Sequence, residues 1–365
     1  MLYKYSAWKN SHIQENIINN IWWFNTPIDF NDPFDINPSF DMDEKDKECL
    51  IKELRIPKPI GDSLSVEQIL AFIRQGDRGK RYNSRYGIFC LSCKNDDILM
   101  WSHYGDQHKG ICLGFDIPKE GMQLRDQSER NIIEDKDFAV KLLEMEYKSE
   151  RPKFKYGKIS NPMQMIEKIL RVKSEKWSYE KEKRIMIRAE QEEFFPCELR
   201  YPPEYLTEVI IGANASIGDF LDITGFIEDN SLRVNVFLST LDKDEYKLGI
   251  ISLTGEQLEQ VNSNLKKVKD YDINEIKEYW KSQGKYTKFL ELTDDKFREK
   301  WKKGIDQIPV YCIWEYTPHF FDINMETFLY KKECAINEFL IEVILLKELI
   351  ADNIEYEMKW DKRNQ

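Results

Sequence analysis

The spacing of hydrophobic and polar residues predicts short strands and helices over the first 240 positions. Period-two alternation predicts a first strand over 2–8, and Ile13, Ile17 and Ile18 recur at the spacing of one helix face. Further strands are predicted over 21–25, 85–93, 110–116, 142–147, 184–188, 205–211 and 232–238. Further helices are predicted over 41–55, 65–74, 98–104 and 162–176, with another starting at 216. This pattern predicts an α+β fold, in which helices flank a mixed, mainly antiparallel sheet.

The pattern changes beyond about residue 248. Lysine and glutamate then dominate at helical spacing over 254–269 and 273–302, and residues 325–352 also have helical periodicity. We therefore predict two regions: an α+β domain over 1–248 that carries the candidate site, and a mainly helical region over 249–365.

Composition narrows the class of protein. The chain has 365 residues, of which 41% are hydrophobic and 13% aromatic, and this favours a folded chain. No apolar run approaches the roughly 20 residues of a membrane span, and the first residues lack a signal-peptide core. The seven cysteines are scattered and odd in number, which favours reduced thiols. We therefore expect a cytoplasmic protein without a membrane partner.

The net charge of −11 argues against broad nucleic-acid binding, but two local basic groups stand out. Each is either a solvated loop or part of a basic groove. The groups are Arg78, Lys80, Arg81 and Arg85, and Lys148, Arg151, Lys153, Lys155 and Lys158.

Several common sites are not supported by the sequence. There is no phosphate-binding loop, dinucleotide fingerprint or zinc-protease motif. Cys90 and Cys93 have the spacing of half a zinc site, but no second cysteine pair follows, so no metal is expected. Ser63 lies in a lipase-like Gly-Asp-Ser-Leu segment without suitable partners, and is interpreted with Ser65 as a helix start.

A short segment after the strand at 85–93 concentrates different polar groups. It holds Trp101, Ser102, His103, Tyr104, Asp106, His108 and Lys109. Only four histidines occur in the chain and two lie here, so His103 is a candidate site residue.

Two other segments carry candidate chemistry. Asn31 and Asp32 lie in a turn that either serves structure alone or faces a ligand. Glu180 and Glu182 stand two apart and would project to one side of an extended chain. Such like charges need neighbouring cations or a functional role, and Lys181, Lys183 and Arg184 are the nearest in sequence.

Taken in order, these motifs resemble a bacterial family called domain of unknown function 2971. The resemblance spans residues 1–240. It rests on Leu2-Tyr3-Lys4-Tyr5, Asn25-Thr26-Pro27 to Asp35, Phe89 to Ser92, Leu99 to Tyr104 with Lys109-Gly110, Trp177 with Tyr179 to Glu182 and Arg184, and Tyr205 to Gly212. Ser6 departs from the arginine usual in the family.

The order of a strand-one basic residue, a strand serine and Glu-x-Glu is also similar to ADP-ribosyltransferases. That similarity implies NAD as co-substrate, with Ser92 as a brace, Glu182 as the catalytic carboxylate and Glu180 as its helper. His103 or Tyr104 would contact ribose or nicotinamide, and Lys4 would replace the missing arginine. The implied catalytic set is Glu182, Glu180 and His103, and the implied cofactor-binding set is Lys4, Asn31, Asp32, Ser92, Trp101, Tyr104 and Tyr179.

The sequence leaves three hypotheses open. The first is an NAD-dependent enzyme that modifies a nucleic-acid or protein target, as a toxin or phage-defence effector would. The second is a metal-dependent nuclease with Asp32, Asp35, His103 and Glu182 as ligands. The third is a non-catalytic module that senses a ligand or binds a partner.

Overall fold

The computed structural model describes residues 1–310 with gaps. The gaps are 11, 42, 54, 70–83, 119–121, 127–137, 156–161, 190–193, 243, 270–273, 275–276, 279–280, 282–292 and 307–308. The predicted helix over 325–352, most of the basic group around Arg78 and the end of the predicted helix over 65–74 lie outside the described residues.

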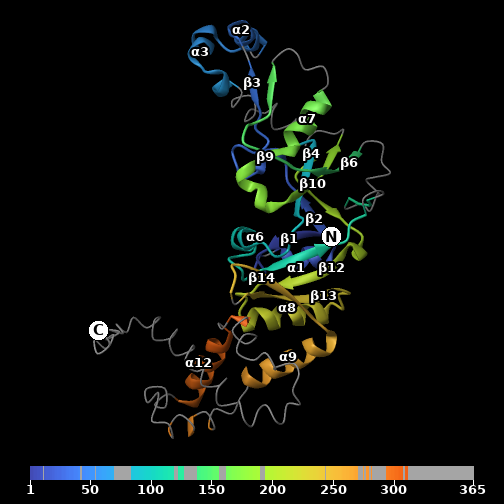
Figure 1. Ribbon diagram of the computed structural model, residues 1–365, viewed down its shortest axis with the longest axis vertical. Coiled ribbons are helices and arrows are strands. Elements are labelled where there is room, and N and C mark those ends of the chain that lie inside the picture. Colours follow the sequence, from blue (N-terminus) through green and yellow to red (C-terminus); the bar gives the residue numbers. More distant parts are fainter. Residues whose placement is uncertain are drawn as a thin grey trace, which may run out of the picture. The chain divides into compact units, whose positions relative to one another are not determined.

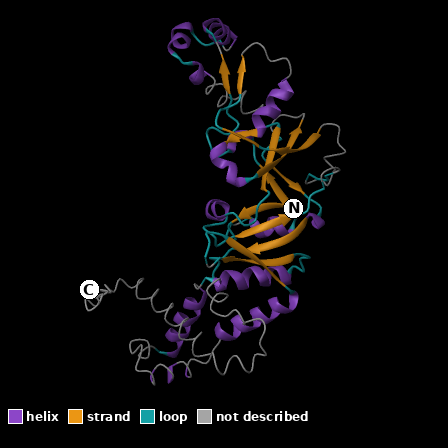
Figure 2. Cartoon of the chain, viewed as in Figure 1, coloured by secondary structure: helices purple, strands orange, loops and turns teal. Residues whose placement is uncertain are grey.

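The main sheet has eight strands in the order β14-β13-β12-β5-β1-β4-β10-β6. They are β1 (Leu2–Ser6), β4 (Tyr86–Ser92), β5 (Ile111–Phe115), β6 (Phe138–Glu144), β10 (Glu182–Ala189), β12 (Leu206–Ile211), β13 (Asn235–Leu241) and β14 (Leu248–Leu253). Strand β10 is antiparallel to both β4 and β6, whereas β12 and β13 are parallel. The predicted α+β class with a mainly antiparallel sheet is confirmed (Figure 2).

Among the described residues, three two-stranded sheets accompany it. They pair β2 (Ile21–Phe24) with β11 (Cys197–Arg200), β3 (Ser39–Asp41) with β8 (Lys153–Lys155), and β7 (Glu146–Lys148) with β9 (Val172–Ser174). The sequence pattern did not predict β3, β8, β9, β11 or β14.

The helices within the described residues are mostly short. They include α1 (Ile13–Ile18), η1 (Pro27–Asp29), α2 (Glu44–Glu53), α3 (Lys58–Ser63), α6 (Ile98–Tyr104), α7 (Pro162–Arg171), η2 (Glu175–Glu180), η3 (Pro203–Tyr205), α8 (Ile217–Asp229), α9 (Gly255–Lys269) and α12 (Asp294–Asp306). Helix α6 has the predicted bounds, because the Asp97 carboxylate accepts hydrogen bonds from the Leu99 and Met100 amides and starts the helix there. Ser65 and Gln68 form the predicted reciprocal cap.

The chain forms two compact units. The first unit comprises Met1–Lys4, Asn10–Met100 and Leu113–Thr207, and the second comprises Tyr5–Lys9, Trp101–Cys112 and Glu208–Gln365. The boundary predicted near residue 248 stays a prediction; β14 begins there and pairs with β13.

An aromatic group forms much of the first unit's core. The Trp22 indole lies 4.8 Å from each of the rings of Phe89 and Tyr201 and meets Phe115 edge to face. A second cluster lies along β4, β10 and α7, and includes Ile88, Leu170 and Met186. Partly buried Phe30 and Cys90 pack against this cluster.

In the second unit, α8, α9 and α12 contact one another, and α8 lies next to β13 (Figure 1). Ser216 caps α8, since its hydroxyl accepts a hydrogen bond from the Asp219 amide. The Trp8 indole N–H donates to the Asp222 carboxylate at 2.6 Å and fixes the segment after β1 to this helix.

Candidate functional site

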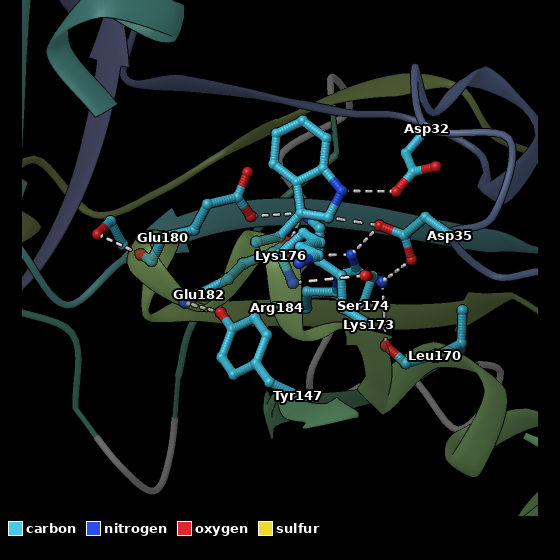
Figure 3. A network of polar contacts seen from close by, with 12 residues as sticks. Asp32, Asp35, Tyr147, Leu170, Lys173, Ser174, Lys176, Glu180, Glu182 and Arg184 are labelled. Atoms are coloured by element: carbon cyan, nitrogen blue, oxygen red, sulfur yellow. Dashed lines mark hydrogen bonds and ion pairs between the residues drawn. The ribbon is translucent and has the colours of Figure 1, made fainter. Parts of the chain in front are cut away.

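Five charged side chains gather in the interior of the first unit, and we call them the ionic network. They are Asp35, which precedes β3, Lys173 on β9, Glu180 at the end of η2, and Glu182 and Arg184 on β10. Each exposes less than a tenth of its surface, from 1% for Arg184 to 9% for Lys173. Figure 3 shows the carboxylates facing the two cationic groups.

Lys173 bridges the acidic side chains. Its Nζ atom lies 3.0 Å from Glu182 Oε2 and 3.7 Å from Asp35 Oδ2, and it also donates to Glu180 Oε2. An ammonium has three hydrogens, so these carboxylates are suited to satisfy it. The two glutamates therefore meet on one cation, although they come from different elements.

All three guanidinium nitrogens of Arg184 donate hydrogen bonds. Nε donates to Glu182 Oε1 at 2.7 Å, Nη2 donates to Glu182 Oε2 at 3.2 Å and to Asp35, and Nη1 donates to Asp35 Oδ1 at 3.1 Å. Nη1 also donates to the Leu170 carbonyl, and the Phe30 ring centre lies 5.0 Å from Cζ. Such bidentate pairing fixes both carboxylates in direction as well as position.

The charges decide the ionisation of the network. Burial by itself would raise the pKa of Glu182, but Arg184 and Lys173 outweigh burial and lower it to about 2. Burial likewise opposes the charge of Lys173, yet Glu182 and Glu180 raise its pKa above the usual range. The network thus places three carboxyl groups beside two cationic groups, and all five are buried.

The backbone around the two glutamates differs from the prediction. We predicted an extended pair, but Glu180 ends η2 and Lys181 adopts a left-handed conformation at φ 45° before β10 begins. That turn brings both carboxylates to Lys173. The prediction of a helix continuing to residue 176 was also wrong. The chain leaves α7 after Arg171 to pair with β7, and Ser174 caps η2 by accepting a hydrogen bond from the Lys176 amide.

The edge of the network is aromatic and partly exposed. The Trp177 indole N–H donates to Asp32 Oδ2 at 2.7 Å, and Lys173 Nζ lies 5.2 Å from the centre of the Trp177 ring. The ring centres of Trp177 and Tyr179 are 6.0 Å apart. Burial, followed by the charge of Glu180, raises the pKa of Tyr179 to about 12, so its hydroxyl stays protonated at neutral pH.

The turn that carries Asn31 and Asp32 is an Asx turn, because Asp32 Oδ1 accepts a hydrogen bond from the Phe34 amide at 2.8 Å. Asp32 also holds Trp177, whereas Asn31 is exposed. We predicted that both phenylalanines of this turn anchor it in the core. Phe30 does so beneath Arg184, but Phe34 is 63% exposed.

Ser92 contacts the Glu180 backbone, and Lys4 contacts β4, the strand that carries Ser92. The Ser92 hydroxyl donates to the Glu180 carbonyl at 2.7 Å, and Ser92 lies opposite Glu182 in the β4–β10 ladder. It also lies opposite Tyr3 of β1. Lys4 Nζ donates to the Cys90 carbonyl at 3.1 Å and lies 4.8 Å from the centre of the Phe89 ring.

His103, Tyr104 and Trp101 belong to the second unit. Trp101 is fully buried and meets the Tyr5 ring edge to face at 5.2 Å, so it is a core residue of that unit. His103 is exposed and Tyr104 is half-buried, with ring centres 6.2 Å apart. Their predicted contacts with a cofactor stay predictions.

Sequence reasoning missed Lys173 and Tyr147 and undervalued Asp35. The Tyr147 hydroxyl accepts a hydrogen bond from the Glu182 amide at 2.7 Å, and burial raises the pKa of Tyr147 to about 12. Lys173 was assigned to a helix, where nothing marked it as special. Of the three predicted neutralising residues, Arg184 joins the network, whereas Lys183 pairs instead with Glu144 near the surface.

The comparisons with known proteins define only a family of uncharacterised proteins. Residues 100–185 match the family described as "Protein of unknown function (DUF2971)", which confirms the resemblance over that segment. The matched segment includes Lys173, Glu180, Glu182 and Arg184. The searches of the curated proteins and of the solved structures found no match.

Two structural properties bear on the class of protein. In the described part of the chain, none of the helices has the length and apolar character that a bilayer crossing requires. Among the described residues, no group of three or more His, Cys, Asp and Glu side chains is arranged to hold a metal ion.

Proposed function

We propose that the first unit cleaves the nicotinamide–ribose bond of NAD and transfers the ADP-ribosyl group to a protein or nucleic acid. The observation that carries this proposal is the convergence of two buried carboxylates, Glu180 and Glu182, on Lys173. Positive charge develops on the ribose as nicotinamide leaves, and a fixed carboxylate in a dry site stabilises that charge. The ionised Glu182 carboxylate has the required sign of charge.

The positions of Ser92 and Glu182 support the same chemistry. Ser92 braces the Glu180 backbone and lies across the ladder from Glu182. This is the bracing role that similarity to ADP-ribosyltransferases implies for such a serine. Because Arg184 and Lys173 hold both oxygens of Glu182, this side chain is fixed and permanently ionised near neutral pH. It therefore acts through its charge rather than by moving protons.

The aromatic edge would serve to hold NAD. Trp177 and Tyr179 lie three positions and one position before Glu180 and are half-buried, so their rings are available to stack on a flat heterocycle. Asp32 fixes the plane of the Trp177 indole. The residues present therefore fit a nicotinamide or adenine ring beside the carboxylate pair.

The test is nicotinamide release from labelled NAD by the purified protein, with bacterial lysate as the source of targets. Glu182→Gln should abolish release, and Glu180→Gln should lower it strongly. Glu144→Gln is the matched control, since Glu144 is an exposed carboxylate paired with Lys183 on the neighbouring strand. Thermal unfolding of each variant must show that it is folded. Undiminished release by folded Glu182→Gln would refute the role of this residue.

A cellular role follows from this chemistry. An enzyme that consumes NAD to modify a macromolecule is suited to act as a toxin or a phage-defence effector. Transfer of label from adenine-labelled NAD to lysate protein or nucleic acid would identify the class of target. Release of nicotinamide without any labelled macromolecule would restrict the activity to NAD hydrolysis.

One observation favours a second candidate, a non-catalytic module that binds a ligand or partner. Each of the three buried carboxylates already contacts a cation, as in a network that serves only to join β9, β10 and η2. This candidate predicts that NAD is not turned over. The nuclease alternative finds no support in the described residues, because they offer no group suited to hold a metal ion.

A further inference from the structure

A strained turn in the second unit follows helix α6. Three consecutive residues adopt left-handed backbone conformations: Asp106 at φ 51°, Gln107 at φ 56° and His108 at φ 67°. Side chains other than glycine cost about 1–2 kcal/mol per residue in this region. Residues in such conformations persist only where their surroundings impose them, and they are frequent at functional sites.

The surroundings of this turn do impose its shape. The Trp101 carbonyl accepts hydrogen bonds from the amides of both Gly105 and His108, at 3.1 and 3.2 Å. The Asn214 amide donates to the His108 carbonyl at 2.8 Å. Gly212 lies so close that a Cβ atom there would be 2.3 Å from the His108 carbonyl oxygen. The position of His108 is therefore set from both sides of the turn.

The turn places the His108 imidazole beside the Ser102 hydroxyl. His108 Nε2 lies 3.0 Å from Ser102 Oγ, and the imidazole is nearly parallel to the Trp101 indole, at 15° with ring centres 6.3 Å apart. This distance is that of an activated nucleophile and its base. Ser102 and His108 are both half-buried, so they retain some access to solvent.

The environment of His108 favours its neutral form. Within the described residues, the buried Nδ1 atom has no hydrogen-bond partner. The doubly protonated imidazolium would need acceptors at both nitrogens, and only Nε2 faces one. Burial also lowers the pKa of His108. In the neutral tautomer that carries its proton on Nδ1, the Nε2 atom can accept the hydroxyl proton of Ser102.

We propose that Ser102 and His108 are a nucleophile and general base that cleave an activated carboxylic ester. Ser102 Oγ attacks the carbonyl carbon while its proton passes to His108 Nε2, and the C–O bond to the alcohol breaks as that alcohol takes the proton. Water then attacks the acyl-Ser102 ester, again with His108 as base, and the acid and free Ser102 are formed. No oxidant, metal or cofactor is needed, and NAD plays no part.

A fluorophosphonate probe tests the proposal directly, because Ser102 Oγ would displace its fluoride and keep the phosphonyl group. Peptide mass spectrometry of the labelled full chain should place the adduct on Ser102. Ser102→Ala should remove that adduct. His108→Ala should slow labelling about 100-fold or more, the effect typical of a lost general base. Added imidazole should restore part of the rate, since it can replace the deleted ring.

Two control variants test specificity. Ser63→Ala removes an exposed serine whose hydroxyl donates to the Ile60 carbonyl, and His12→Ala removes an exposed histidine. Both should label at the wild-type rate. Absence of an adduct on Ser102 in the wild-type chain would overturn the proposal. So would equal labelling of wild type and folded His108→Ala, or a slow His108→Ala that imidazole does not rescue. The esterase substrate p-nitrophenyl acetate should follow the same pattern.

Discussion

The ionic network and the turn at His108 hold their polar groups in place in different ways. In the network, five charged side chains are removed from water, and each is held by opposite charge. At the turn, a neutral pair is half-buried and held by backbone hydrogen bonds around strained residues. The first arrangement is stable only while all its charges are present, whereas the second depends on space and backbone shape. Four predictions test that difference.

The largest effect is expected from removing the network's buried guanidinium. Arg184→Met leaves Asp35 and Glu182 buried with too little positive charge, which should lower the free energy of unfolding by about 3–5 kcal/mol. Lys183→Met is the neighbouring control: its ion pair with the exposed Glu144 should contribute about 0–1 kcal/mol. Urea unfolding of both variants measures the difference. Equal losses would show that burial of the network does not matter.

The second-largest effect is expected from acid, which should weaken the ionic network. The pKa of Glu182 is about 2 in the folded chain against an ordinary 4.5, so its contribution is complete above pH 4.5 and is lost as pH falls towards 2. At about 1.4 kcal/mol for each pKa unit, this contribution is about 3 kcal/mol. The free energy of unfolding, measured from pH 6 to pH 2, should fall less in Glu182→Gln than in wild type. Glu144→Gln should retain the wild-type slope.

The third effect concerns the turn at His108, which should be destabilised by added side-chain volume next to it. Gly212→Ala places a methyl group against the His108 carbonyl, and the required shift should cost about 1–3 kcal/mol. It should also slow the labelling of Ser102. Gly225→Ala in α8 is the control, because a Cβ atom there meets nothing within 4 Å. That change should be neutral or should stabilise the protein by up to about 1 kcal/mol. Thermal and urea unfolding compare the two.

The smallest effect should reveal the strain itself. Gln107→Gly relieves a positive φ and should raise the free energy of unfolding by about 1 kcal/mol. Lys109→Gly, two residues along, relieves no positive φ and should lower it by about 0.4–1 kcal/mol through the added freedom of the unfolded chain. A loss of stability in Gln107→Gly would mean that the left-handed turn carries no strain.

Local chemistry made much of the fold predictable. The bounds of α6 follow from Asp97 and the periodicity after it, and the Asx turn follows from Asp32 and Pro33. Most strands of the main sheet also lie where alternation or apolar runs predicted them, but β14 was not predicted. The predictions failed where long-range pairing overrode the local pattern, as at Lys173, which leaves a helical pattern to pair with β7.

The sequence by itself determined the class of fold and the polar segment at 101–109, and it marked Glu180 and Glu182 as candidate site residues. Only the tertiary structure decided which cations meet those carboxylates, because Asp35 and Arg184 are 149 positions apart and meet only in the folded chain. It likewise decided that Glu182 stays ionised, since that depends on the balance between burial and two nearby charges. The contact between Ser102 and His108 was also decided by the tertiary structure, because three left-handed residues turn the His108 imidazole back towards α6.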